Sequence, residues 1–140
     1  MPWEQADFKP HPRSMKLGSL ATHVAQLPNF LTVLATTDVL HFKPEEFTPP
    51  AIGSTADLLS LFDTESAKMH DALAQLDWAR LDGLWKMMMG EHTIIDNKRG
   101  YLLRHKGVNH LVHHRAQLGV YHRLLDVKIP GSYGTSADEM

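Results

Sequence analysis

Three histidines in this chain have a spacing that suits a metal site. His110 and His114 are four residues apart within Asn109–Leu118, and on a helix positions i and i+4 share one face. His23 lies in an earlier segment of helical pattern and would add a third imidazole nitrogen from a neighbouring helix. Three protein nitrogens leave positions of a divalent ion open, which distinguishes a reactive metal site from a structural one.

The spacing of these histidines is a weak signal when taken alone. The chain has ten histidines in 140 residues, and that frequency gives about 0.7 pairs at i,i+4 by chance. A coincidental pair on a solvated helix face is therefore the simpler interpretation of His110 and His114. The sequence around the histidines is therefore needed to distinguish a metal site from a coincidental pair.

The composition is that of an ordinary domain, with 43% hydrophobic and 21% charged residues and a net charge of -2. We expect one domain over residues 1–140, large enough for a sizeable core. The charge and the lack of a basic stripe argue against nucleic-acid binding, and no apolar run approaches the roughly 18 residues of a membrane span. The absence of cysteine excludes disulfides, thiolate ligands and a cysteine nucleophile. With no signal-peptide pattern at the start, we expect a cytoplasmic protein.

Three stretches of the chain have apolar residues at helical spacing. The first runs from about Leu17 to Asp38, and Pro28 is expected to kink or divide it. The second runs from a Ser54 cap to about Leu76. The third and longest runs from Lys98 to about Asp126, with a glycine at position 107 as a weak point.

The remaining segments are expected to be irregular. Residues 1–13 carry three prolines, residues 41–53 form a proline-rich linker, and residues 78–97 have no clear period, although Trp85–Met89 suits an extended strand. Three long helices predict an all-α bundle. Because a conventional bundle has four helices, either the bundle is incomplete or a second subunit covers its open face.

The chain resembles the DinB-like (damage-inducible B, also YfiT-like) family of metal-binding four-helix bundles over roughly Phe8 to Glu139. Three stretches carry the resemblance. The first is Phe8–Met15, which leads into Leu17–His23, and the second is Asn109–Leu118, which is similar to the family's last-helix signature. The third, Ile129–Gly134 with Ser136, Asp138 and Glu139, is similar to the family's closing loop. The last-helix signature is the most specific of the three stretches.

The resemblance implies that His23, His110 and His114 hold a divalent metal ion. It implies an all-α, DinB/YfiT-like four-helix bundle that lacks or shortens the first helix, because family members usually begin with a helix before the Pro-His-Pro stretch. It also implies a homodimer, which would cover the exposed face. Since other members are transferases or isomerases that use low-molecular-weight thiols, it implies such a thiol as the small-molecule partner.

The expected chemistry follows from the three neutral ligands. They leave the ion its full charge, so that it lowers the pKa of bound water to about 7 or deprotonates a thiol. Because the chain has no cysteine, the thiol has to come from a cosubstrate. Zinc or nickel suits three nitrogens. A zincin protease is excluded, since Leu111 stands where that motif has glutamate. We assign no catalytic residue, because Asp63, Glu65 and Asp71 suit a solvated helix face equally well.

Five further residues have two interpretations each. Gln117 suits a hydrogen bond that supports a metal ligand, and Arg115 suits either an acidic substrate or an ion pair within the chain. Trp85 and Tyr133 suit a pocket wall or the core, and His113 suits a surface or interface position. Two functions stay open: a metal-dependent transferase or hydrolase, and a non-catalytic stress-response or interaction protein with a structural or vestigial metal site.

Overall fold

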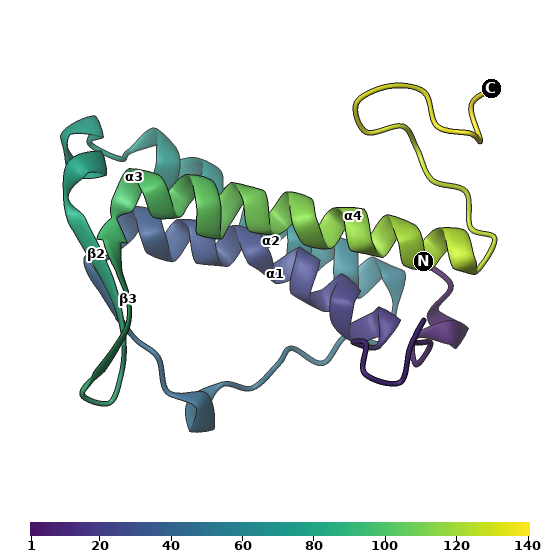
Figure 1. The fold of residues 1–140 in the computed structure, drawn as a ribbon, viewed down its shortest axis with the longest axis horizontal. Coiled ribbons are helices and arrows are strands. Elements are labelled where there is room, and N and C mark those ends of the chain that lie inside the picture. Colours follow the sequence, from purple (N-terminus) through teal and green to yellow (C-terminus); the bar gives the residue numbers. More distant parts are fainter.

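The computed structural model describes residues 1–140 as three long helical segments with a small sheet at one end (Figure 1). In chain order the elements are η1 (Trp3–Gln5), α1 (Leu17–Thr36), β1 (Val39–His41), η2 (Pro44–Glu46), α2 (Thr55–Ala74), η3 (Trp78–Asp82), β2 (Leu84–Met89), β3 (His92–Lys98), α3 (Arg99–Leu102), η4 (Leu103–Val108) and α4 (Asn109–Leu124). No helix has the length and hydropathy needed to cross a membrane.

Helix α1 is the centre of the molecule. Its buried residues recur along its whole length: Leu17, Leu20, Ala21, Ala25, Leu27, Pro28, Leu31, Leu34 and Ala35. By contrast, Glu65 is the one buried residue of α2, and Tyr121 is the one buried residue of α4. Helices α2 and α4 therefore cover α1 from its sides. Helix α1 continues through Pro28, so of the two expected effects, a kink or a division, the division is wrong.

The prediction of an all-α four-helix bundle is wrong, because three strands form a sheet in the order β1-β2-β3. Strand β1 is parallel to β2, and β2 is antiparallel to β3. The hairpin turns at Gly90–Glu91, where Gly90 has φ +59° and thereby supplies the left-handed conformation of a two-residue turn. The fold is therefore a set of three helical segments with a mixed sheet, and the expected extended stretch Trp85–Met89 lies in β2.

The sheet is fixed to the end of α1 by Trp85. This side chain is fully buried against Leu34 of α1 and Leu102 of α3, and its indole N–H donates to Thr37 Oγ1 at 3.1 Å. A buried indole with a satisfied N–H combines a large apolar contact with no unpaired donor. Trp85 is thus a core residue and does not line the pocket suggested as one of its two roles.

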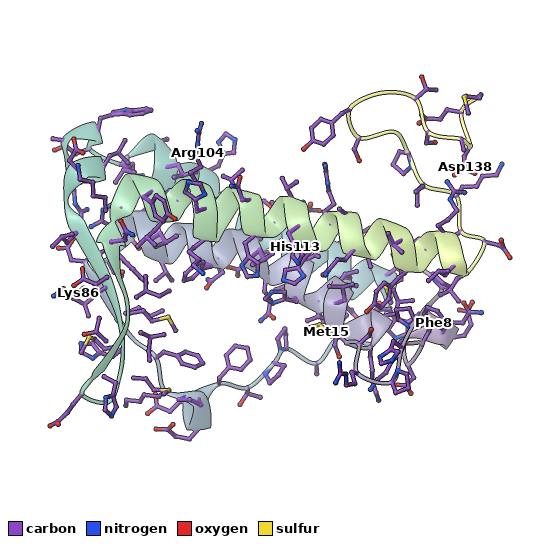
Figure 2. All side chains as sticks on the ribbon, viewed as in Figure 1. Phe8, Met15, Lys86, Arg104, His113 and Asp138 are labelled. Carbon is purple, nitrogen blue, oxygen red and sulfur yellow. The ribbon has the colours of Figure 1, made fainter.

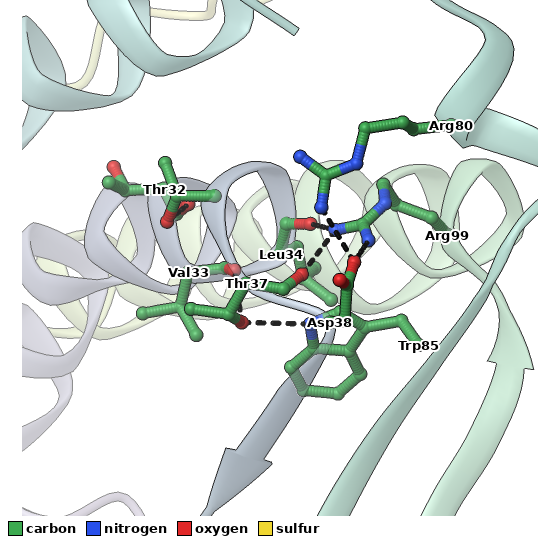
Figure 3. A network of polar contacts seen from close by, with 9 residues as sticks. Thr32, Val33, Leu34, Thr37, Asp38, Arg80, Trp85 and Arg99 are labelled. Carbon is green, nitrogen blue, oxygen red and sulfur yellow. Dashed lines mark hydrogen bonds and ion pairs between the residues drawn. The ribbon is translucent and has the colours of Figure 1, made fainter. Parts of the chain in front are cut away.

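Arg99 holds the carboxyl end of α1 against the start of the last helical segment (Figure 3). Its Nη1 donates to the backbone carbonyls of Leu34 and Thr37, and its Nη2 pairs with Asp38. The carbonyls at the end of a helix lack partners within the helix, so the guanidinium satisfies two groups that would otherwise be buried without partners. Arg80 reaches the same carboxylate at 2.6 Å.

The second predicted helix is confirmed, including its cap. Ser54 Oγ accepts a hydrogen bond from the Asp57 backbone N–H at 3.1 Å, and α2 follows as Thr55–Ala74. Satisfying one of the free N–H groups of the first turn is the reason that serine is favoured at this position.

The last helical segment runs from Arg99 to Leu124 and contains one π-helical stretch, η4. Gly107 lies in η4 against Leu31 of α1, and a β-carbon at residue 107 would lie 2.2 Å from Leu31 Cδ2. Glycine therefore allows the two helices to approach more closely than any other residue would. Gly107, the expected weak point, thus lies where the segment departs from α-helical geometry and where it contacts Leu31 of α1.

The C-terminal tail folds back along α4. Arg123 forms two hydrogen bonds with the Asp138 carboxylate, at 3.0 and 2.7 Å, and the Ile129 backbone N–H donates to the same group at 2.9 Å. Further along the helix, the Arg115 guanidinium lies 5.4 Å from the centre of the Tyr133 ring. These contacts connect residues 129–138 to α4, and in Figure 1 the yellow segment turns back above the end of that helix.

We expect Gly107→Ala to destabilise the protein by about 1–3 kcal/mol, because the added methyl group forces Leu31 or the helix backbone to move. Chemical denaturation gives the free energy of unfolding. Gly119→Ala is the matched control, since nothing lies within 4 Å of a β-carbon there. That substitution should instead stabilise the protein by up to about 1 kcal/mol, because alanine favours helix. Equal effects of the two substitutions would contradict the close contact.

We expect the attachment of the C-terminal tail to weaken at low pH. The Arg123 guanidinium, followed by the Ile129 N–H, holds the pKa of Asp138 at about 2. The carboxyl pKa in the unfolded chain is about 3.9, so the contribution of the ionised carboxylate is complete above pH 4 and is lost as the pH falls towards 2. An NMR titration of the Asp138 carboxyl carbon should give a midpoint near 2, which moves up in Arg123→Gln. A midpoint near 4 in the unaltered protein would disprove the pairing.

Candidate metal centre

The three predicted histidines meet between α1 and α4. These helices run antiparallel, since Leu17 packs with Tyr121 at one end of the molecule and Leu34 with Leu102 at the other. Nε2 of His110 lies 3.5 Å from His23 Nε2 and 2.9 Å from His114 Nε2. One ring nitrogen from each histidine lies within 4.8 Å of the others. Figure 2 labels the neighbouring His113 on the same middle part of α4.

Gln117 orients the His114 ring through the expected supporting hydrogen bond, although its side chain accepts that bond where the sequence suggested a donor. The distance between His114 Nδ1 and Gln117 Oε1 is 2.7 Å. An amide oxygen only accepts, so Nδ1 carries the proton, and Nε2 of the neutral ring keeps a free lone pair. That lone pair faces His110 and His23.

The surroundings of the cluster favour neutral imidazoles. Burial lowers the pKa of His23 below its ordinary value, and positive charge on His114 or His110 would lower it further. Burial is also the main cause of the lowered pKa of His110, followed by His114, although hydrogen bonding to the Lys106 backbone acts in the opposite direction. Neutral rings at pH 7 are the form that binds metal ions.

The cluster has the donors and the spacing that a divalent ion needs. Two nitrogens bound to a tetrahedral zinc ion at about 2.0–2.1 Å would lie about 3.4 Å apart. The observed Nε2 separations of 2.9 and 3.5 Å lie on either side of that value. Because all three ring nitrogens lie within 4.8 Å of one another, the three imidazoles are close enough to hold one such ion. A lone pair directed at two other ring nitrogens is the arrangement that a cation stabilises.

A cavity of about 790 Å³ opens beside the cluster, and His23 and His110 form part of its wall. Its volume lies in the range of small-molecule sites, and apolar side chains make up much of its lining. Two of the candidate acids, Asp63 and Asp71, are exposed on α2, whereas Glu65 is buried and lines the cavity. A small molecule in this space would lie next to the three ring nitrogens.

The structure places the other candidates outside the cavity. His113 is exposed, and its ring lies 4.8 Å from that of His114. Arg115 forms no ion pair within the chain, and its guanidinium lies over Tyr133. Tyr133 itself is 86% exposed, and so it is neither in the core nor on the cavity wall.

The sequence analysis missed Lys106 and the aromatic side chains of the cavity wall. Lys106 lies four residues before His110, so the same helical spacing that pairs His110 with His114 would have placed it near the site. Phe42 and Phe47 come from the proline-rich linker, where no period indicates which way a side chain points. Their role becomes apparent only from the folded chain.

Comparison with known proteins defines the fold. No model of a known protein family matches the chain, and no curated protein sequence does. Among solved structures, the chain is similar to a DinB-like protein, YjoA from Bacillus subtilis, with a TM-score of 0.68 and 22% sequence identity over 95% of this chain and 84% of that one. The predicted resemblance to DinB-like proteins is thus confirmed for the fold.

Proposed function

We propose that this protein binds one divalent metal ion through His23, His110 and His114 and acts on a small molecule held in the adjoining cavity. The observation that carries the proposal is the convergence of three imidazoles, two of which line a cavity of about 790 Å³. A structural metal site is closed by four protein ligands, whereas three histidines leave room for a substrate.

The ion we propose is zinc or nickel, since both suit nitrogen ligands. A divalent ion with neutral ligands supplies Lewis acidity, which lowers the pKa of a bound water to about 7 and deprotonates a bound thiol. The reaction we propose is therefore thiol S-transfer or hydrolysis. A low-molecular-weight thiol would have to be a cosubstrate, because the chain has no cysteine. A cytoplasmic location is part of the same proposal, since a reducing compartment keeps such a thiol reduced.

The chain's own side chains have distinct parts in this proposal. Gln117 keeps the proton of His114 on Nδ1 and so keeps Nε2 available. The apolar wall excludes water, which strengthens electrostatic interactions inside the cavity. Glu65 is no obvious general base, because Lys68 and Asn29 already occupy its carboxylate at 2.7 and 2.9 Å.

The alternative is a non-catalytic stress-response or interaction protein with a structural or vestigial metal site. In proteins with structural metal sites, binding of the ion supplies much of the folding free energy. Here two core clusters, around Leu17 and around Trp85, lie on either side of the histidines and do not include them. We therefore favour the enzyme, and we expect the metal-free protein to be folded.

We expect protein purified without an affinity tag to contain nearly one metal ion per chain. In His114→Ala the metal content should be at least tenfold lower, because two imidazoles hold an ion much less tightly. Elemental mass spectrometry measures the content and identifies the ion. His113→Ala is the matched control, since it removes the exposed neighbouring ring. The proposal fails if the unaltered protein contains no metal and takes up neither zinc nor nickel.

We also propose a homodimer formed through a groove between α2 and the last helical segment. The groove has a volume of about 680 Å³ and is lined by Leu73, Leu76, Trp78, Leu103 and Val108, among others. Trp78 is 82% exposed, which is unusual for so large an apolar side chain. Outside the ion pairs within the chain, α2 keeps three acids, Asp57, Asp63 and Asp71, and residues 99–124 keep three cations, Arg104, Lys106 and Arg115, and no acid. A two-fold axis would pair these opposite charges twice.

We expect the protein to have the mass of a dimer in light scattering after size exclusion, and Trp78→Asp to convert it to a monomer. An aspartate in the groove would bury an unpaired charge in the dimer. Tyr133→Asp serves as the control, because Tyr133 is equally exposed but lies outside the groove. A monomeric mass for the unaltered protein would rule out this part of the proposal.

A further inference from the structure

The cavity beside the histidines is elongated, because it follows α1 over almost three turns. Its wall includes side chains of α1 from His23 to Val33, which corresponds to about 15 Å along the helix axis. The far end reaches the sheet, where Leu40, Met87 and Ile95 form the wall. The cavity thus connects the histidine cluster with the apolar inner side of the sheet.

The polarity of the wall changes along this length. At the end near the cluster the wall contains His23, Gln26 and His110, and Lys106 lies one helical turn from His110 on the side towards the sheet. Towards the sheet it is formed by Phe30, Val33 and the three apolar side chains of the strands. A ligand complementary to this wall has one polar end and a long apolar body.

The charges in the cavity favour an anionic polar end. The charge of Glu65 is balanced by Lys68, whose Nζ lies 2.7 Å from its carboxylate, and the Asn29 amide donates a hydrogen bond to the same group. Lys106 takes part in none of the ion pairs of the structure. The unpaired charge on the cavity wall is therefore the positive charge of Lys106, which lies one helical turn from His110.

The linker between β1 and α2 supplies the outer wall. Phe42, Phe47 and Pro50 line the cavity from this segment, which bows along one side of the helices in Figure 1. The Phe42 and Phe47 ring centres are 6.4 Å apart, and Phe47 remains 55% exposed. An apolar body in the cavity would cover the exposed ring surface that faces it.

We infer that this cavity binds an amphipathic anion, a molecule with a carboxylate head beside Lys106 and His110 and an unbranched hydrocarbon chain that runs along α1 towards the sheet. The inference rests on the proposed function in one respect, since a metal ion at the three histidines would attract the same head. The apolar half of the site and Lys106 do not depend on the ion.

The test is calorimetric titration of the full-length protein, metal-free and zinc-loaded, with decanoate, 1-decanol and acetate. We expect decanoate to bind both forms, 1-decanol to bind more weakly, and acetate to show no measurable binding to the metal-free form. Lys106→Ala should weaken decanoate about tenfold, the usual effect of removing a charged hydrogen-bond partner, and should leave 1-decanol unchanged. Lys128→Ala is the matched control and should alter neither. Phe47→Ala should weaken decanoate and 1-decanol alike.

The outcomes separate the inference from the proposed function. If zinc binds but neither decanoate nor 1-decanol does, the inference is wrong and the metal site stands. If decanoate binds and depends on Lys106 while zinc does not bind, the inference stands and the metal site is wrong. Decanoate binding that is equal in Lys106→Ala and Lys128→Ala would overturn the assignment of the head to Lys106.

Discussion

The close contact between Leu31 of α1 and Gly107 of η4 sets the separation of the two helices that carry the histidines. A single β-carbon at residue 107 would come within 2.2 Å of the leucine, so the approach requires glycine. His23 lies about two turns before Leu31, and His114 lies about two turns after Gly107, with His110 one turn nearer to the glycine. In an antiparallel pair these positions face one another, so the contact that brings the helices together also brings the imidazoles together. The Arg99 network and Trp85 fix the same two helices at the sheet end.

The histidine cluster places three polar imidazoles between α1 and α4, where helix packing alone would favour apolar side chains. Three imidazoles at mutual distances of 2.9–4.8 Å lose hydration, and burial lowers the pKa of two of them. Gln117 then orients the His114 lone pair towards its neighbours instead of towards solvent. Such an arrangement is unfavourable without a cation and favourable with one, and local costs of this kind are typical of functional sites. The apolar cores at both ends of α1 offset that cost.

Much of the site could be predicted from the sequence, because its signals are local. The i,i+4 spacing of His110 and His114, the Ser54 cap and the apolar period of α1 all depend on residues within a few turns of each other. The sheet could not be predicted in the same way. Strand β3 has one partly buried residue among seven, so it has no alternation, and Met87–Met89 in β2 favour helix as readily as strand. β1 has three residues and pairs with a strand more than forty residues away.

The cavity and the close helix contact were missed for a related reason. The sequence shows that residue 107 is glycine, but only the fold shows that Leu31 occupies the space of its absent side chain. The linker residues Phe42 and Phe47 are likewise assigned to the cavity by the path of the chain and not by any pattern. Lys106 is the exception, since its spacing from His110 was available and was not used. Long-range packing therefore determines the cavity and the approach of His23, and local spacing places His110 and His114 on one face of α4.

X-ray absorption spectroscopy of the zinc-loaded protein is the most direct test of the central claim that α1 and α4 together form a three-histidine metal site. The account predicts three imidazole ligands at about 2.0–2.1 Å, with at least one further position taken by solvent. Changing His23 to Ala should remove one imidazole from the spectrum, since this residue comes from the other helix. An ion that keeps the same ligands in His23→Ala, or one bound by four protein groups, would contradict the account.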